Sequence, residues 1–591
     1  MAEETDFNDI LHDIVLSEEA HEKESYKDGF QAGVESGNAE GFHLGYHKGF
    51  QLGRELGYYM GIVTRHLKLN ETLETKYTDK IIKQLQKVKE LIEEFPQTNS
   101  EDHDILKMAE IIRSQFRKAC SLLNISSNNP YDLRQNLDST ITFLTPYLPL
   151  ANCHMVEFFT QSHWVTLLPN NLRNYLEKCD FNDAVDTFWK AAEDFNNENE
   201  ITKWVRNARN HSLVVNDEYC LTLQGLQNLL KSRGCCVQPE IKVTEFMNSK
   251  KSYEVQTMSA YVATLHNMCG TTHCVEAGGG KGHLLVALSL GYQIPSLTID
   301  CDEQTLKNAE KRVKIIQKQW HAIAKKINEK SEEKVSGCID GELHKFTTAF
   351  ITKDTNLSKV VRSQFPCADV KLLLTGLHTC GNLGPDSLRI FSTNSNVSAL
   401  FNVPCCYHLL SEEVDGGLYD VFQRDFGGVV DCYGFPMSEH LRGLNLGRNA
   451  RMLAAQSIER VTSRKQLPET SLLYRALLQA IIKKHSPQSA IKEGRLKGLS
   501  CKTFEEYLNT ADAILKIGLD RCQIPETNID CEWKKIVLFY LVRLCLAQVV
   551  ESVILMDRLL FLYENGFEDV YLVKLFDPVL SPRCHSIVAI R

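Results

Sequence analysis

The segment Val275-Glu276-Ala277-Gly278-Gly279-Gly280-Lys281-Gly282 decides the fold of the larger part of this chain. Its apolar beginning is typical of a strand, and glycines at alternate positions then allow a tight turn whose backbone can approach a ligand closely. These glycines are Gly278, Gly280 and Gly282. A dinucleotide fingerprint would need glycine where the chain has His283, and a P-loop would need Ser or Thr directly after Lys281. The spacing therefore favours a turn around an uncharged or zwitterionic ligand over a phosphate site.

An acidic residue ends the next apolar run, Leu297-Thr298-Ile299-Asp300. A carboxylate at the end of a second strand can accept hydrogen bonds from both hydroxyls of a ribose. Asp302 is the alternative acid, but Asp300 ends the strand directly. Glu276 precedes the turn, and Asp354, after a third strand, is a candidate contact for the adenine. Together these residues predict S-adenosylmethionine as the cofactor. The alternative is a loop that only turns tightly.

Strands and helices alternate after residue 255, which is typical of a doubly wound sheet. The expected strands are Cys274 to Ala277, Ser296 to Ile299, Thr347 to Ile351, Val370 to Thr375, Val397 to Val403, Asp569 to Phe576 and Ser586 to Ile590. We expect an α/β Rossmann-like class I methyltransferase domain over residues 256–591, with a large helical insertion over 411–566. A helical extension over 131–255 and an all-α N-terminal adaptor would precede it.

Reactive side chains follow the fourth and fifth expected strands, whose carboxyl ends face the ligand crevice in this topology. They are His378, Cys380, Cys405 and Cys406. Methyl transfer requires alignment of donor and acceptor and sometimes a base, a role that His378 could serve. The alternative is a histidine that only joins the loops. A metal site from Cys405, Cys406 and His408 is the other alternative, but adjacent cysteines differ from the usual ligand spacing, so no metal is expected.

Four further strings resemble the methyltransferase-like protein 25 family over residues 131–591. They are Lys250-Lys251-Ser252-Tyr253-Glu254-Val255, Gly376-Leu377-His378-Thr379-Cys380-Gly381-Asn382-Leu383, Val403-Pro404-Cys405-Cys406-Tyr407-His408 and Gly434-Phe435-Pro436-Met437-Ser438. The resemblance implies a methyltransferase domain with a helical extension and a helical insertion, and names no substrate. The second and third strings also look loosely similar to segments of a tRNA ribose methyltransferase family, which favours RNA over protein as the acceptor.

A basic segment follows the ribose acid and carries one tryptophan, Trp320. Its cations are Lys307, Lys311, Arg312, Lys314, Lys318, Lys325, Lys326 and Lys330. Such a helix could hold RNA phosphates and stack a base. The alternative is a solvated face with Trp320 packed inward.

A second glycine pattern lies near the N-terminus, with one glycine every four residues. Its members are Gly29, Gly33, Gly37, Gly41, Gly45, Gly49, Gly53, Gly57 and Gly61. Residues 7–66 hold no proline and many good helix formers, so helix is expected although each interior glycine costs about 1 kcal/mol relative to alanine. The array over residues 1–66 therefore predicts a partner that lies against the stripe formed by these glycines. Spaced apolar residues over 75–95 and 102–124 predict a helical hairpin within 67–125.

The array and the strings Leu91-Ile92-Glu93-Glu94-Phe95-Pro96 and Ile112-Arg113-Ser114-Gln115-Phe116 resemble the deca-Gly-x-x-x adaptor family, represented in human by oral cancer overexpressed protein 1. The resemblance over residues 1–124 implies pairing with a second glycine-array protein and delivery of iron-sulfur clusters to an ATP-binding-cassette protein of ribosome recycling. Delivery uses a free C-terminus in that family, whereas this chain continues past residue 124. Charged residues between the glycines, such as Arg54 and Glu55, argue against a membrane dimer.

Composition limits the remaining choices for the 591 residues. The net charge of −9 gives no overall attraction to nucleic acid, and the acidic beginning lacks the order of a secretory signal. We therefore expect the cytosol, or the nucleus, and reduced thiols among the twenty cysteines. Charges within Ile536 to Leu562 predict a buried helix there rather than a membrane span. The leading hypothesis is a methyltransferase with an adaptor module; the alternative is a non-catalytic assembly factor.

Overall fold

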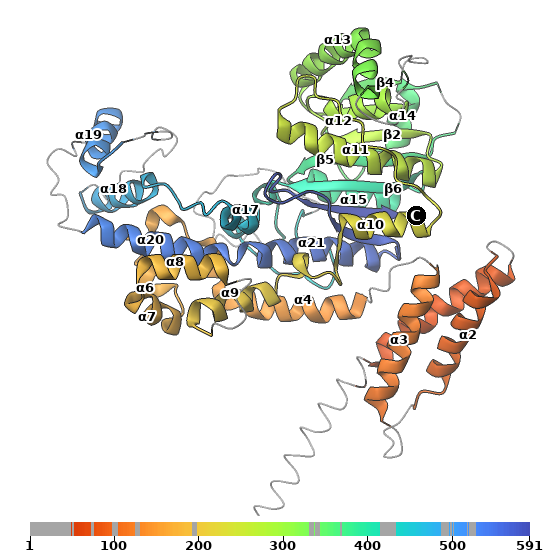
Figure 1. The fold of residues 1–591 in the computed structure, drawn as a ribbon, viewed down its shortest axis with the longest axis horizontal. Coiled ribbons are helices and arrows are strands. Elements are labelled where there is room, and N and C mark those ends of the chain that lie inside the picture. Colours follow the sequence, from red (N-terminus) through yellow and green to blue (C-terminus); the bar gives the residue numbers. More distant parts are fainter. Residues whose placement is uncertain are drawn as a thin grey trace, which may run out of the picture. The chain divides into compact units, whose positions relative to one another are not determined.

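The computed structural model of the protein consists of two compact units, residues 1–123 and 124–591 (Figure 1). The described residues are 49, 52–72, 76–96, 104–123, 130–191, 198–329, 336, 343–366, 369–413, 433–485, 496, 499, 501–516, 518 and 528–591. Five glycines of the N-terminal array, Gly29 to Gly45, lie outside them.

The first unit is a helix over residues 52–71 packed on a helical hairpin, α2 (Asp79–Glu93) and α3 (Ile105–Leu123). Tyr59 and Phe116 stack at its centre, with ring centroids 4.0 Å apart. The buried Glu55 carboxylate accepts two hydrogen bonds from Arg113, of 2.6 and 2.7 Å. The first helix therefore turns its aromatic and acidic positions, and not its glycines, toward the hairpin.

The second unit is built on an eight-stranded sheet in the order β1-β7-β8-β6-β5-β2-β3-β4. All paired strands are parallel except β8, which runs antiparallel to both β6 and β7. The strands are β1 Cys220–Thr222, β2 His273–Ala277, β3 Ser296–Asp300, β4 His344–Thr348, β5 Leu372–Cys380, β6 Val397–Cys405, β7 Val570–Lys574 and β8 His585–Ile590. Chain order reverses between β2 and β5, so a ligand crevice is expected at the carboxyl ends of these two strands.

Helices cover both faces of the sheet because successive strand residues point to opposite sides. In β5, Leu372 and Leu374 join the core that holds α15 (Leu383–Thr393) and α21 (Ala547–Glu564). Leu373 instead joins the core that holds α10 (Leu223–Ser232), α11 (Ser249–Cys269) and α12 (His283–Val286). Two separate apolar layers thus fix the central strands from both sides.

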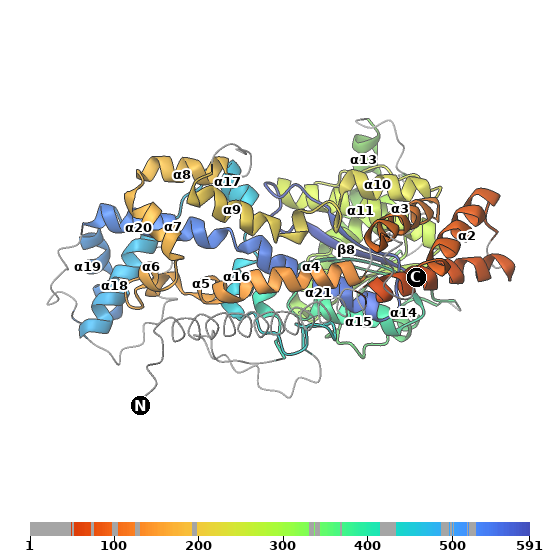
Figure 2. The same ribbon diagram turned by 90° about the horizontal axis from the view of Figure 1, so that it is seen from below.

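The helices before and after the sheet-forming segments share one core with the sheet. α4 (Pro130–Leu144) runs beside α21, as Figure 2 shows, and Trp204 donates to the carbonyl of Val542 at 3.0 Å. The remaining helices of at least four residues are α5 Leu148–Asn152, α6 His163–Thr166, α7 Asn170–Lys178, α8 Phe181–Lys190, α9 Glu200–Asn210, α13 Glu303–Asn328, α14 Leu357–Gln364, α16 Arg448–Leu453, α17 Ile458–Ser463, α18 Ser471–His485, α19 Phe504–Leu515 and α20 Ile529–Leu544, with a π-helical turn at Ala287–Gly291. The described part of residues 131–255 therefore shares its core with the rest of the second unit, and β1 within it extends the sheet.

One stretch, Ile529–Glu564, is long and apolar enough to cross a membrane by length and composition. It comprises α20 and α21, and 89% of its most apolar window is buried inside the protein. Packing against neighbouring helices accounts for its hydrophobicity.

Three strand predictions need correction. β4 begins and ends three residues earlier than predicted, because its His344 pairs with Ser296 of β3. β5 and β6 continue to Cys380 and Cys405, beyond the predicted ends. The reactive residues of β5 therefore belong to the end of a strand and not to a following loop.

Candidate active site

The glycine turn follows β2 directly and has the backbone that its sequence predicts. Gly278, Gly280 and Gly282 all adopt positive φ, at 66, 50 and 71°, which side chains disfavour. A Cβ added at Gly279 would lie 2.5 Å from the side chains of both Glu276 and Thr298. At Gly280, by contrast, an added Cβ would meet only an oxygen of Asp300, 3.9 Å away. The turn is thus closed on its β2 side and open beside Asp300.

Asp300 ends β3 beside this open position. Its Oδ2 accepts a 2.9 Å hydrogen bond from the amide of Gly280, and its Oδ1 accepts one from the amide of Asp302. Each oxygen retains a second lone pair for a ligand hydroxyl. The rival acid, Asp302, is the N-cap of α13 and accepts from Thr305. The geometry therefore fits Asp300, and not Asp302, as the ribose acceptor.

Glu276 lies beneath the turn and is almost fully buried. It accepts a 2.7 Å hydrogen bond from the hydroxyl of Thr298. Burial raises the pKa of Glu276 to about 7, although the Thr298 hydrogen bond acts in the opposite direction. Near neutral pH this carboxyl group can therefore gain or lose a proton when a charged ligand binds above it.

A cavity of about 350 Å³ opens beside the glycine turn. Its lining comes from the turn, from the segment before α11, from α11 and α12, and from β5. Representative lining residues are Phe246, Asn248, Lys251, Gly278, Gly279 and His378. The volume lies in the range usual for small-molecule sites, and the cavity lies at the carboxyl ends of β2 and β5, where the crevice is predicted. Gly280, Gly282 and Asp300 do not line it.

His378 reaches this cavity because β5 bulges there. The register of β5 against β6 shifts between Leu377 and Thr379, and His378 adopts a φ of 70°. A non-glycine residue in this region signals a constrained position. The bulge takes His378 out of the regular pairing of the two strands.

A buried carboxylate, Glu254 of α11, orients His378. Glu254 Oε2 lies 3.0 Å from His378 Nε2 and 2.7 Å from Lys251 Nζ, and its Oε1 accepts from the Ser581 hydroxyl at 2.6 Å. Although burial alone raises the pKa of Glu254, the hydrogen bond from His378, aided by Lys251 and Ser581, lowers it well below its usual range. In the neutral tautomer of His378 that donates its Nε2 proton to Glu254, Nδ1 is the acceptor nitrogen.

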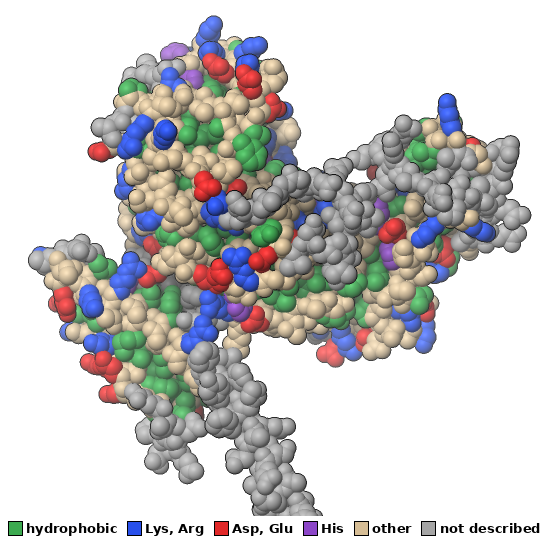
Figure 3. All heavy atoms as spheres, turned by 180° about the vertical axis from the view of Figure 1, so that it is seen from behind, with side chains coloured by type: hydrophobic (Ala, Val, Ile, Leu, Met, Phe, Trp, Pro, Cys, Tyr) green, Lys and Arg blue, Asp and Glu red, His purple; other side chains and the backbone are tan. Residues whose placement is uncertain are grey.

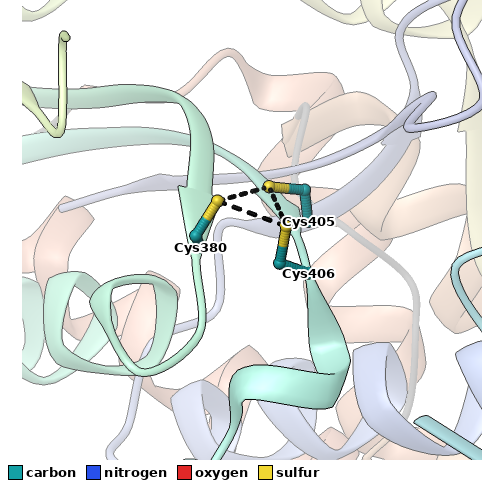
Figure 4. Close-up of side chains that lie close together, drawn as sticks. All are labelled: Cys380, Cys405 and Cys406. Carbon is teal, nitrogen blue, oxygen red and sulfur yellow. Dashed lines mark hydrogen bonds between the residues drawn. The ribbon is translucent and has the colours of Figure 1, made fainter. Parts of the chain in front are cut away.

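Three cysteine sulfurs meet at the carboxyl ends of β5 and β6 (Figure 4). The Sγ of Cys380 is 3.1 Å from that of Cys405 and 3.4 Å from that of Cys406, and the last two are 3.6 Å apart. Hydrogen bonds from Cys380 and Cys405 lower the pKa of the Cys406 thiol, whereas hydrogen bonding to Cys380 and Cys406 raises that of Cys405.

The other predicted contacts are placed elsewhere. Asp354 has a side chain that is 78% exposed, lies in a different surface depression and does not line the cavity beside the glycine turn. Trp320 is fully buried and donates to the carbonyl of Ser336, so its ring is not available to stack a base. Arg312 of the same helix donates to the carbonyl of Lys281. On the visible face of the second unit in Figure 3, basic and acidic side chains of the described residues are intermixed.

Sequence reasoning missed the roles of Glu254, Lys251 and Ser581. Glu254 and His378 are separated by 124 residues, and Ser581 lies a further 203 residues along the chain. The string Lys250 to Val255 carries the family resemblance but gives no role to any of its residues.

Two segments of the chain match known protein families. A family model described as a methyltransferase domain matches residues 250–413, and one described as the N-terminal part of essential protein Yae1 matches residues 25–63. The chain is similar to proteins named probable methyltransferase-like protein 25 from Mus musculus and Homo sapiens. Identities are 27% over 594 positions and 28% over 604, covering 78% of this chain in both cases and 96% and 97% of the relatives. No solved structure matches the chain.

The second unit therefore contains a methyltransferase domain, and the predicted resemblance to methyltransferase-like protein 25 is confirmed at this level of similarity. For the N-terminal array the matching model is that of Yae1. The resemblance to the family of oral cancer overexpressed protein 1 stays a prediction.

Proposed function

We propose that the protein transfers a methyl group from S-adenosylmethionine. The observation that carries this proposal is the open glycine turn beside Asp300, where a Cβ at Gly280 would meet only an oxygen of Asp300, at 3.9 Å. In the proposed complex the turn receives the donor, Asp300 accepts from its ribose, and Glu276 lies beneath it. The bound donor would supply an activated methyl group. The residues of the chain would hold donor and acceptor in place and remove a proton from the acceptor.

The acceptor side of the site would be formed by the ends of β5 and β6. His378 is the proposed base, because Glu254 holds its Nε2 and Nδ1 remains as the acceptor nitrogen. Glu254 is a positioning residue, since it would act through His378. RNA is the acceptor that we favour over protein, and the loose similarity to a tRNA ribose methyltransferase family supports that choice.

Calorimetric titration of the full chain with S-adenosylmethionine tests the donor assignment. Asp300→Ala should weaken binding about 10-fold or more, because two hydroxyl acceptors are lost. Asp302→Ala is the matched control: it removes a neighbouring carboxylate that caps a helix and should leave the affinity within about 2-fold. Absence of binding by the wild-type chain, or equal losses in the two variants, would refute the assignment.

The acceptor can be sought with methyl-labelled donor and cell extract. Label that survives protease but is lost after RNase treatment would support RNA, and the reverse result would contradict it. His378→Ala and Glu254→Gln should both lower the rate while donor affinity stays within a few-fold. A conservative Glu254→Asp variant should recover part of the rate if Glu254 acts by holding His378.

For the first unit we propose that the glycine stripe receives a helix of a second glycine-array protein. Gly49, Gly53, Gly57 and Gly61 have no atom within 4 Å of an added Cβ, and the similarity to the Yae1 N-terminal model supports a pairing role. A link to an iron-sulfur ATP-binding-cassette protein in the cytosol is the corresponding proposal for the assembly. Affinity purification of the full chain tests it, and recovery of a glycine-array protein supports pairing. Loss of that protein from the variant Gly53→Ala/Gly57→Ala/Gly61→Ala would assign the contact to the stripe.

The competing function is that of a non-catalytic assembly factor. Recovery of the glycine-array partner together with no donor binding would select it. The exposed stripe favours this alternative only for the first unit, because the second unit has a formed cavity at its glycine turn.

A further inference from the structure

The cluster of Cys380, Cys405 and Cys406 arises from the strand register and not from a sequence motif. Cys380 and Cys405 are register partners at the last paired positions of β5 and β6. Neighbouring strands lie about 4.8 Å apart, and residues paired in register point to the same face of the sheet. The first two sulfurs therefore meet wherever these strands pair in this way.

The third sulfur joins them because of the backbone at Cys406. In a continuing strand Cys406 would point to the face opposite Cys405. It instead adopts the left-handed region, with φ 41° and ψ 48°, and begins the turn Tyr407–Leu409. This conformation is unfavourable for a residue with a side chain, and here it directs two adjacent thiols toward a third (Figure 4).

A nitrogen is available close by. Nδ1 of His408 is buried and has no hydrogen-bond partner among the residues that the structure describes. His408 lies in the turn after Cys406, but its ring nitrogens are not within 4.8 Å of all three sulfurs, so its side chain has to turn to reach the cluster. A buried imidazole nitrogen without a partner is costly unless a ligand satisfies it.

We propose that Cys380, Cys405 and Cys406 bind a zinc ion, with His408 as the fourth ligand once its side chain turns toward the three sulfurs. Three sulfurs and one nitrogen form a donor set typical of zinc. Tetrahedral zinc with bonds of about 2.3 Å separates its sulfurs by about 3.8 Å, so the observed separations need to widen by less than 1 Å. The ion would fasten the carboxyl ends of β5 and β6 together, two residues from His378. The site does not depend on donor binding, and its test is separate.

Metal analysis of the full chain, purified under reducing conditions from cells supplied with zinc, iron and copper, tests the site. Native mass spectrometry and elemental analysis should find about one zinc ion per chain. The double variant Cys405→Ser/Cys406→Ser should lose it. The matched control is Cys235→Ser/Cys236→Ser, which alters the other adjacent cysteine pair, in the segment after α10, and should retain the full content.

Cobalt substitution provides a readout that does not depend on activity. Tetrahedral cobalt with thiolate ligands should give charge-transfer and intense visible bands in the wild type and the control, but not in Cys380→Ser. His408→Ala should bind zinc at least about 10-fold more weakly in chelator competition.

Several outcomes would overturn the proposal: no metal in the reduced wild type, iron with acid-labile sulfide, copper in place of zinc, or equal zinc in the two double variants. If His408→Ala binds zinc as tightly as the wild type, His408 is not the fourth ligand. Circular dichroism checks the fold of each variant, and the wild-type cobalt spectrum remains decisive if a variant does not fold.

Discussion

The chain uses glycine in two places for opposite physical reasons. In the helix over residues 52–71, Gly53, Gly57 and Gly61 have ordinary helical backbones, and open space lies where their side chains would be. In the turn after β2, Gly278 and Gly280 have positive φ that side chains disfavour. The first set shapes an outer surface, whereas the second set makes a backbone conformation possible.

This difference teaches how the two sets should respond to the same substitution. Alanine is a better helix former than glycine by about 1 kcal/mol, so it should stabilise the isolated helix. A Cβ at positive φ costs about 1–2 kcal/mol, so alanine should destabilise the turn. The sign of the change in stability therefore distinguishes a surface glycine from a conformational one.

The largest expected effect is at Gly280. Gly280→Arg places a long cation in the open position beside Asp300 and should weaken S-adenosylmethionine binding by at least about 100-fold. Gly280→Ala is the control, since its Cβ would have only ordinary contact with Asp300, and should retain measurable binding. Titration calorimetry on the full chain measures both. Equal affinities for Arg and Ala would show that the donor does not occupy this position.

The next effect concerns the helical glycines. Gly53→Ala/Gly57→Ala/Gly61→Ala should stabilise residues 52–71 by about 2–3 kcal/mol, because no neighbouring atom obstructs the new methyl groups. Hydrogen exchange of that helix in the full chain should slow accordingly, while capture of a glycine-array partner should fall. Faster exchange in the triple variant would mean that the glycines serve a conformational need after all.

The third effect follows from the protonation of Glu276. Its pKa is raised from an ordinary 4.5 to about 7, so the folded state binds the proton more tightly than the unfolded state. The contribution of Glu276 to the free energy of unfolding should therefore be highest below about pH 4.5. It should fall by roughly 2–3 kcal/mol as the pH rises to 7. Denaturant unfolding of the wild type and of Glu276→Gln at several pH values measures this contribution. It should be absent from the variant, in which the amide oxygen can still accept from Thr298; parallel pH profiles would contradict the assignment.

The smallest effect concerns the opposite face of the glycine helix. Arg113→Met removes the partner of the buried Glu55 and should destabilise the helix over residues 52–71 by about 1–2 kcal/mol. Hydrogen exchange should quicken there, and residues of the second unit serve as the internal control. If exchange is unchanged, the contact between Glu55 and Arg113 does not hold this helix on its hairpin.

The glycine turn, β2, β3 and Asp300 could be predicted because their signals are local. An apolar run, a glycine pattern and a terminal acid occur within 26 residues, from Val275 to Asp300. β4 was placed too late, since its register against β3 decides its limits and His344 has no local strand signal. β1 has three residues, too few for a periodic pattern.

The remaining site features depend on contacts between distant segments. Glu254 meets His378 only after α11 has packed on the sheet, and Cys380 meets Cys405 only through strand pairing. The spacing rule for metal ligands considers positions along one segment, so it gave no weight to a cysteine on the neighbouring strand. Trp320 could be assigned to the core only as one of two interpretations until its burial was seen.

The pairing of β1 with β7 sets the order of events during synthesis. Thr222 pairs with Lys574, so the sheet edge stays open until nearly the whole chain has been made. At 5–20 residues per second the ribosome needs roughly 20–70 s to pass from one strand to the other. The helices of the first unit emerge well before that interval. A partner helix could therefore meet the glycine stripe on the nascent chain before the methyltransferase sheet is complete.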